Sequence, residues 1–219
     1  MPASWIITLT DVHFTFATGR KVLNGVNLSL GVGEKIALLG ANGAGKSSLL
    51  HCVMGLAPIQ QGDIAIFGRA CLTENDFRTI RGRVGLLFQD SDDQLFCPTV
   101  LEDVMFGPLN LGHSRDEARE SALQVLSDLG LGGFGDRITY QLSGGEKRLV
   151  ALATVLAMSP DVLLLDEPTN GLDADVEKRL IAILQSLPQS MLIISHDRDF
   201  LDQIATRFVR LENGVIVNV

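Results

Sequence analysis

The chain has 219 residues, and 46% of them are hydrophobic, which is enough to build one substantial core. Acidic residues number 26 against 18 basic ones, and the net charge of −8 argues against nucleic acid as a partner, because an acidic surface repels phosphate backbones. The three cysteines are odd in number and lack the spacing of a metal site, so reduced thiols in a cytosolic protein are expected.

The sequence up to residue 89 is dominated by predicted strands. Short apolar segments, rich in β-branched and aromatic residues, predict strands at 6–16, 22–30, 35–39, 63–67 and 83–88. The first two flank the turn-like residues 17–19, which predicts an antiparallel pair. A helix is predicted at 46–54, and Gly55 marks its end.

Residues 90–140 have a different character, acidic and polar at first and then helical. Two capping boxes, in which Thr or Ser is followed three residues later by Glu, begin at Thr99 and Ser114. After the second box, apolar residues fall on one helical face: Ala118, Ala122, Val125, Leu126 and Leu129. The sequence therefore predicts a small helical lobe inserted in a larger α/β core.

Strands and helices alternate in the remainder of the chain. Residues 149–158 predict a buried helix of about half the length of a membrane span. Short buried strands follow at 161–165 and 191–194, each succeeded by helix-like sequence. This alternation predicts an α/β fold with a mostly parallel sheet.

One domain is expected to span residues 1–219. Its α/β core, with an antiparallel β-subdomain near the N-terminus, is predicted at 1–89 and 141–219, and the helical subdomain at 90–140.

A glycine-rich loop carries the first chemical signal. Residues 40–47 read Gly-Ala-Asn-Gly-Ala-Gly-Lys-Ser and match the P-loop template, with an apolar strand before and a helix after. The glycines let backbone N–H groups turn toward phosphate oxygens, Lys46 adds a full positive charge, and the Ser47 hydroxyl is placed for Mg²⁺. A flexible glycine-rich turn is the alternative. The pattern predicts binding of a nucleoside triphosphate by Gly40, Asn42, Gly43, Ala44, Gly45, Lys46, Ser47 and Ser48.

Two consecutive carboxylates follow the apolar strand at 161–165. Ligands of open α/β sheets bind at the carboxyl ends of the strands, so Asp166 and Glu167 are expected at the ligand. Asp166 is predicted to reach Mg²⁺, directly or through water, and Glu167 to polarise the attacking water as a base or orienting group. Solvated carboxylates at a strand end are the alternative.

A Gly-Gly pair precedes the apolar helix. Residues 142–146 read Leu-Ser-Gly-Gly-Glu, and glycines would be a poor choice inside a helix but allow close approach of an anion at its start. The alternative is an ordinary helix cap made by Ser143.

These segments, together with Pro168-Thr169-Asn170-Gly171-Leu172-Asp173, resemble the ABC ATPases along nearly the whole chain. The resemblance implies that Ser143, Gly144 and Gly145 complete the nucleotide site of the opposite subunit. Two chains would thus form a head-to-tail dimer around two ATP molecules, with each P-loop facing the Gly-Gly segment of the other chain.

The same resemblance assigns roles to four further residues. His196 would contact the γ-phosphate, and Gln89 would contact Mg²⁺ and the water and move with a membrane partner. Phe16 would stack on adenine, although its alternation with Val12 and Phe14 also fits one core face of a strand. Asp173 would communicate across the dimer, or cap the helix that follows it, or do both.

Residues 88–111 contain the most specific run, Phe-Gln-Asp-Ser-Asp-Asp-Gln-Leu-Phe followed by Thr-Val-Leu-Glu-Asp-Val and Phe-Gly-Pro-Leu-Asn-Leu. It resembles the ATPase subunits of energy-coupling-factor importers, above all those for cobalt and nickel. In that group this region receives coupling helices that carry arginines, which implies partner contacts near Gln89, Asp92, Asp93 and Gln94. A solvated acidic loop is the alternative.

The resemblance predicts an ATPase subunit at the cytoplasmic face of the membrane, powering a cobalt or nickel importer with ATP and Mg²⁺. Many such ATPases carry an additional C-terminal segment that holds the dimer together between turnovers, whereas this sequence ends soon after the strand-like residues 215–217. The dimer is therefore expected to be transient without ATP or to be held by other subunits. Three alternatives stay open: another ABC transporter, such as a vitamin-type importer or an exporter, a non-transport ABC ATPase, and a P-loop kinase.

Overall fold

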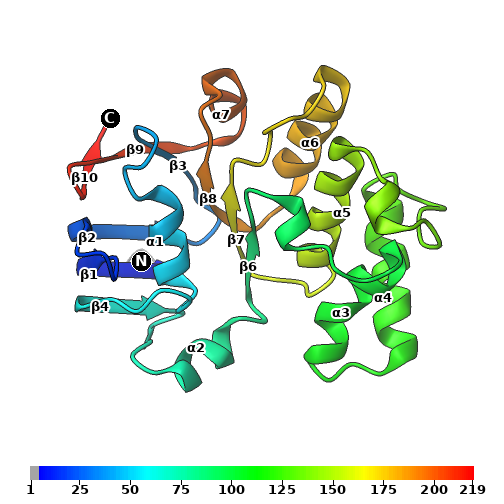
Figure 1. The fold of residues 1–219 in the computed structure, drawn as a ribbon, viewed down its shortest axis with the longest axis horizontal. Helices are drawn as coiled ribbons and strands as arrows, with labels where there is room; N and C mark the ends of the chain where they lie inside the picture. Colours follow the sequence, from blue (N-terminus) through cyan, green and yellow to red (C-terminus); the bar gives the residue numbers. More distant parts are fainter. Residues whose placement is uncertain (1–4) are drawn as a thin grey trace.

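Two sheets with different strand arrangements form the framework of residues 5–219, the part of the chain that the computed structural model describes (Figure 1). The first sheet is antiparallel, with the order β2-β1-β4-β5. Its strands are β1 (Trp5–Thr15), β2 (Lys21–Gly31), β4 (Gln61–Ile66) and β5 (Arg69–Ala70). The predicted antiparallel pair is confirmed, and Phe16 lies just beyond the end of β1.

The second sheet has the order β10-β9-β3-β8-β7-β6, and all neighbours except β10 and β9 are parallel. Its strands are β3 (Lys35–Leu39), β6 (Val84–Leu87), β7 (Val162–Asp166), β8 (Ser190–Ile194), β9 (Arg207–Glu212) and β10 (Val215–Asn218). Every residue of β6, β7 and β8 is buried, as expected for parallel strands covered on both faces. Asp166 pairs with Ile194, so β7 and β8 end side by side.

Helices cover the parallel sheet, and several of them form a helical region on one side of it. They are α1 (Lys46–Val53), α2 (Glu74–Ile80), α3 (Val100–Asn110), α4 (Arg115–Asp128), α5 (Gly144–Leu156), α6 (Ala174–Ser186) and α7 (Arg198–Ile204), with the 3₁₀ turns η1 (Ser91–Asp93) and η2 (Thr139–Gln141). In Figure 1, α3, α4 and α5 lie together at the right, and the antiparallel sheet lies at the left with the parallel strands between. None of the helices described in residues 5–219 combines the length and apolarity that a membrane crossing requires.

Both predicted capping boxes are confirmed at the start of α3 and α4. The hydroxyls of Thr99 and Ser114 accept from backbone amides three residues on, and the glutamates there return the bond. The predicted apolar face of α4 is buried at Ala118, Ala122, Leu126 and Leu129, and Val125 is half-buried.

The parallel sheet separates two apolar clusters. Ile36 and Leu38 of β3 face the cluster shared with the antiparallel sheet and α1, whereas Ala37 between them faces the cluster built with α3–α7. This alternation follows from the two-residue period of a strand. The loop between β3 and α1 is therefore anchored by two cores, which fixes its position at the edge of the sheet.

Candidate functional site

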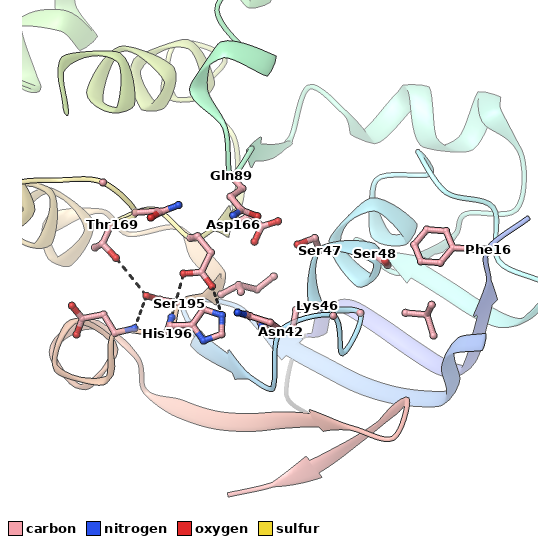
Figure 2. Close-up of a pocket in the computed structure, with 18 of the residues that line it drawn as sticks. Phe16, Asn42, Lys46, Ser47, Ser48, Gln89, Asp166, Thr169, Ser195 and His196 are labelled. Carbon is pink, nitrogen blue, oxygen red and sulfur yellow. Dashed lines mark hydrogen bonds and ion pairs between the residues drawn. The ribbon is translucent and has the colours of Figure 1, made fainter. Parts of the chain in front are cut away.

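A cavity of about 770 Å³ opens at the carboxyl ends of the parallel strands. The structure brings together in its wall most residues predicted to bind nucleotide or Mg²⁺ or to act in catalysis: Phe16, Asn42, Gly43, Gly45, Lys46, Ser47, Ser48, Gln89, Asp166, Glu167 and His196. Figure 2 shows Phe16 at one end and His196 at the other, with Lys46 and Ser47 between them. Gly40 and Ala44 line an adjoining cavity instead, together with Asn42, Gly43 and His196.

The loop before α1 has a backbone that needs glycine. Gly43 and Gly45 have φ angles of 74° and 106°, in the left-handed region that glycine adopts freely. A Cβ on Gly45 would also lie 2.2 Å from Val22 Cγ1. Among residues 5–219 no side chain caps α1, and the first turn of this helix holds no acidic residue, so the first amides of the helix are left to an anion.

Lys46 is almost buried below this loop, with 7% of its surface exposed. Its Nζ donates to the carbonyl oxygens of Gly40 at 2.8 Å and Ala41 at 3.2 Å. Burial lowers the pKa of the ammonium group, and the charges of Glu167 and Asp166 oppose that shift. The Lys46 ammonium group would therefore be stabilised by an anionic group that replaces its lost hydration.

The two carboxylates after β7 differ in surroundings. Asp166 is 5% exposed, and its Oδ1 is buried without a hydrogen-bond partner among residues 5–219. Glu167 adopts a φ of 47°, which is unusual for a residue with a side chain, and its N–H donates to the Ile194 carbonyl at 2.9 Å. This backbone turn aims the carboxylate at the loop that carries His196.

Glu167 and His196 are joined twice. His196 Nε2 lies 3.1 Å from Glu167 Oε1, and the His196 backbone N–H donates to Oε2 at 3.2 Å. Two hydroxyls complete this corner, because Thr169 Oγ1 and Ser195 Oγ share a hydrogen bond of 3.4 Å (Figure 2). No local pattern in the sequence predicted a role for Thr169 or Ser195, whose hydroxyls become part of the site only through the neighbouring ends of β7 and β8.

A buried arginine supports the floor of the site. Arg148 of α5 is 2% exposed and donates to the carbonyls of Phe88 at 2.6 Å, Gln89 at 3.0 Å and Glu167 at 2.5 Å. Burial lowers the pKa of its guanidinium, against the charges of Asp166, Asp90 and Glu167. No site role was predicted for Arg148 either, because its sequence signal is merely a charged residue at the start of an apolar helix.

Phe16 does not belong to the core face of β1. Val12 and Phe14 are buried, whereas Phe16 is 43% exposed and meets the Phe14 ring edge-on at 5.1 Å between centroids. The alternative in which all three residues form one core face is therefore wrong for Phe16, since β1 ends at Thr15 and the chain turns.

The Gly-Gly segment lies outside the first cavity of its own chain. Ser143 and Gly145 line none of the described cavities, and Gly144 lines a second cavity of about 670 Å³ together with Gln89 and Lys147. Ser143 caps α5 in the ordinary way, since its Oγ accepts from the Glu146 amide at 3.3 Å and its own N–H donates to Glu146 Oε2 at 2.8 Å.

Asp173 likewise caps α6. Its Oδ1 accepts from the amides of Asp175 at 3.0 Å and Val176 at 2.9 Å, which is the capping role that sequence analysis allowed for it. None of the described cavities has Asp173 in its wall.

The residues predicted to meet a partner occupy three different environments. Asp92 Oδ1 pairs with Lys147 Nζ at 2.5 Å, and Asp93 has no ion pair within residues 5–219. The Gln94 amide is tied inward, to the carbonyl of Ala151 at 2.9 Å and Thr154 Oγ1 at 2.8 Å.

Comparisons with known proteins agree with this geometry. The ABC transporter family matches residues 23–170. An ABC transporter ATP-binding protein of Brucella suis is 55% identical over 199 residues, covering 91% of this chain and 83% of that protein. The energy-coupling factor transporter ATP-binding protein EcfA of Methanothermobacter thermautotrophicus is 40% identical over 216 residues, covering 97% of this chain and 70% of that one.

Two solved structures share the fold over nearly the whole chain. One is cbiO1 of Clostridium perfringens, part of the ABC transporter complex cbiONQ, with a TM-score of 0.85, 32% identity and coverage of 98% of this chain and 87% of that one. The other is a dimeric ATP-binding cassette bound to ADP and Pi, with a TM-score of 0.88, 27% identity and coverage of 97% and 98%. The chain belongs to the ABC transporter family, as an ATP-binding subunit and ATPase that resembles the energy-coupling-factor group.

Proposed function

We propose that this ATPase powers a membrane importer of the energy-coupling-factor type, with cobalt or nickel ions as the cargo. The observation that carries the proposal is the position of Gln89, which lines both the first cavity and the second one, where Asp92 and Asp93 also lie. A partner that moves this segment would thus act directly on the wall of the nucleotide site. The similarity to EcfA and to cbiO1 supports this type of importer.

In this proposal the first cavity holds ATP with its base at Phe16 and its phosphates at the loop before α1. Lys46 binds the outer phosphates, and the amides at the start of α1 bind their remaining oxygens. Glu167 polarises the attacking water, and His196, which holds both oxygens of Glu167, contacts the γ-phosphate. Phosphoryl transfer is stabilised electrostatically and needs no covalent step on the protein.

The residues present fit Mg²⁺. The unpartnered Oδ1 of Asp166 is a hard oxygen donor, and the Ser47 hydroxyl and the Gln89 amide line the same cavity. These three residues would hold the ion, which would neutralise charge on the phosphates. Coordination of the ion would give the buried Asp166 oxygen the polar partner that buried polar groups normally have.

A second copy of the chain completes the site in this proposal. Ser143, Gly144 and Gly145 stand at the start of α5 and outside the first cavity of their own chain, so a head-to-tail dimer would let them bind the γ-phosphate held by the other copy. Asp173 would signal across that interface while it caps α6. The structural similarity to a dimeric cassette supports this arrangement.

The transmembrane partner is proposed to contact the surface near Gln89, Asp92, Asp93 and Gln94, from the cytoplasmic face of the membrane. Arginines of the partner would pair with the carboxylates. Asp93 is open to such a contact, Asp92 would have to exchange Lys147 for it, and Gln94 contributes by fixing the segment to α5.

The test is reconstitution of this subunit with its transmembrane partners in vesicles, followed by uptake of Co²⁺, Ni²⁺, Zn²⁺ and a vitamin. ATP-dependent uptake that is confined to Co²⁺ or Ni²⁺ supports the proposal. Uptake of the vitamin, or export, would instead select another ABC transporter, and the Glu167→Gln variant provides the control for hydrolysis.

A further inference from the structure

Arg20 connects the Phe16 end of the nucleotide cavity to the loop before α1. Arg20 lies on the turn between β1 and β2, which also carries Phe16, and its side chain lines the cavity. Its Nη2 donates to the carbonyl oxygen of Gly43 at 2.8 Å, in the loop that receives phosphates. One side chain thus joins the turn that presents an aromatic ring to the loop that presents backbone amides.

The Phe16 end of this connection is held by the backbone. The Phe16 N–H donates to the Arg20 carbonyl at 2.9 Å, and the Gly19 N–H donates to the Phe16 carbonyl at 2.8 Å. These two bonds close the turn and fix the backbone of Phe16 relative to that of Arg20. The edge-on contact with the Phe14 ring also restrains the Phe16 ring.

The Gly43 end is equally defined. Gly43 stands at a φ of 74°, and a Cβ placed on it would meet Arg20 Nη2 at 3.3 Å. The guanidinium therefore packs closely against the outer edge of the loop. The hydrogen bond from Arg20 fixes the orientation of the Gly43 carbonyl in this loop.

We infer that Arg20 is a positioning residue that sets the spacing between the base-stacking ring of Phe16 and the phosphate-binding loop. The inference rests on the proposed stacking role of Phe16. A ligand that carries both a base and phosphates benefits from a fixed spacing, whereas a ligand that carries only phosphates does not. Arg20 thereby favours complete nucleotides over inorganic polyphosphates.

The experiment compares ATP with inorganic tripolyphosphate by isothermal titration, at about 0.3 M salt so that the exposed charge is screened. Arg20→Met should weaken ATP binding about threefold to tenfold, as expected for the loss of one hydrogen bond, and leave tripolyphosphate binding unchanged. The KM for ATP should rise with little change in kcat. Arg20→Lys, which can still donate to the Gly43 carbonyl, should restore most of the ATP affinity.

Arg69→Met is the matched control, because Arg69 is an exposed arginine of β5 outside the cavity. It should leave both affinities unchanged. Thermal unfolding of each variant checks that the fold persists. Equal weakening of ATP and tripolyphosphate by Arg20→Met would overturn the inference, since it would mean that Arg20 contacts the phosphates themselves.

A double-mutant cycle separates this inference from the proposed role of Phe16. Phe16→Ala should weaken ATP binding about tenfold, in the range measured for base stacking on aromatic side chains. If Arg20 acts through the ring, Phe16→Ala/Arg20→Met should bind ATP no more weakly than Phe16→Ala. Additive losses, or an unaffected Arg20→Met beside a weakened Phe16→Ala, would overturn the inference alone, whereas an unaffected Phe16→Ala would overturn the stacking role and the inference with it.

Discussion

His196 contacts both carboxylate oxygens of Glu167: its ring Nε2 lies 3.1 Å from Oε1, and its backbone N–H donates to Oε2 at 3.2 Å. The neighbouring ends of β7 and β8 make this possible, since Asp166 pairs with Ile194 and both strands end at this pair. The left-handed backbone of Glu167 turns its side chain toward that neighbour. A carboxylate fixed in this way is oriented before any substrate arrives, as electrostatic catalysis requires.

Glu167→Gln should bind ATP but hydrolyse it at least about 100-fold more slowly, because the amide keeps the size and loses the base. With saturating ATP the variant should move from monomer to dimer on size exclusion, since the closed state would form and not resolve. Glu120→Gln, on the exposed face of α4, is the control and should hydrolyse normally. A variant that hydrolyses at the wild-type rate would remove Glu167 from the chemistry.

Lys46→Ala should weaken ATP binding by about 100-fold, because it removes a nearly buried ammonium group that would otherwise donate charged hydrogen bonds to phosphate. Isothermal titration with ATP and Mg²⁺ measures the effect. Lys178→Ala removes a lysine side chain that is 77% exposed and should leave the affinity unchanged. Near-normal binding by Lys46→Ala would contradict the role assigned to the loop.

Arg148→Met should lower the free energy of unfolding by about 2–4 kcal/mol, because the carbonyls of Phe88, Gln89 and Glu167 lose a buried donor that methionine cannot replace. Urea unfolding measures the change. Arg198→Met breaks an exposed ion pair with Asp202 and should cost less than about 1 kcal/mol. Equal costs for the two variants would mean that the buried carbonyls do not depend on Arg148.

The parts of the site that the sequence predicted are those encoded in consecutive residues. The loop at 40–47 and the pair Asp166–Glu167 each follow an apolar strand, so a local pattern suffices to place them at the edge of the sheet. Arg148 and Ser195 could not be found in this way, because their roles depend on contacts with segments far away in the sequence.

The same distinction applies to the fold. The capping boxes at Thr99 and Ser114 are complete within four residues, and both helices begin where these boxes predict. Helix α2 and strand β9 were not predicted, although Thr73 and Asp76 form a capping box of the less frequent Asp type. Strand β9 reads Arg-Phe-Val-Arg-Leu-Glu. It pairs with β3, which lies far away in the sequence, so a local pattern does not predict it.

Acid should destabilise the protein through its capping boxes. Hydrogen bonds from the backbone and side chain of Ser114 lower the pKa of Glu117, and the Ser143 backbone does the same for Glu146. A carboxyl with a lowered pKa binds fewer protons when folded than when unfolded. Its stabilising contribution is complete above the ordinary glutamate pKa of about 4.3 and is lost as the pH falls below it.

Glu117→Gln tests this contribution at a site remote from the cavity. The variant should be less stable than the wild type at pH 7 and should lose less stability between about pH 5 and pH 3, because glutamine does not titrate there. Thermal unfolding over this range measures both effects. Glu120→Gln, three residues further along the same helix, should follow the wild-type curve at both ends. Parallel curves for Glu117→Gln and the wild type would show that this box does not carry the pH dependence.

The two aspartates of η1 should respond differently when a cationic partner binds, because only one of them is already paired. Asp92 neutralises Lys147 at 2.5 Å, whereas Asp93 has no ion pair among the residues that the structure describes. Asp93→Asn removes one carboxylate from the proposed contact. Asp92→Asn removes one as well and also leaves the Lys147 charge uncompensated in the cavity that the partner would approach.

Both variants should retain basal hydrolysis, because neither side chain lines the nucleotide cavity. Assembly with the transmembrane subunit should weaken about tenfold for Asp93→Asn. The loss should be larger for Asp92→Asn, because the unpaired Lys147 charge left at the contact costs about a few kcal/mol. Lys147→Met removes the competitor for Asp92 and should leave assembly intact or strengthen it. Pull-down with the transmembrane subunit, run beside an ATPase assay, gives both readouts. Full assembly and transport by both aspartate variants would show that η1 is only a solvated acidic loop, and a loss of basal hydrolysis would place these carboxylates in the nucleotide site instead.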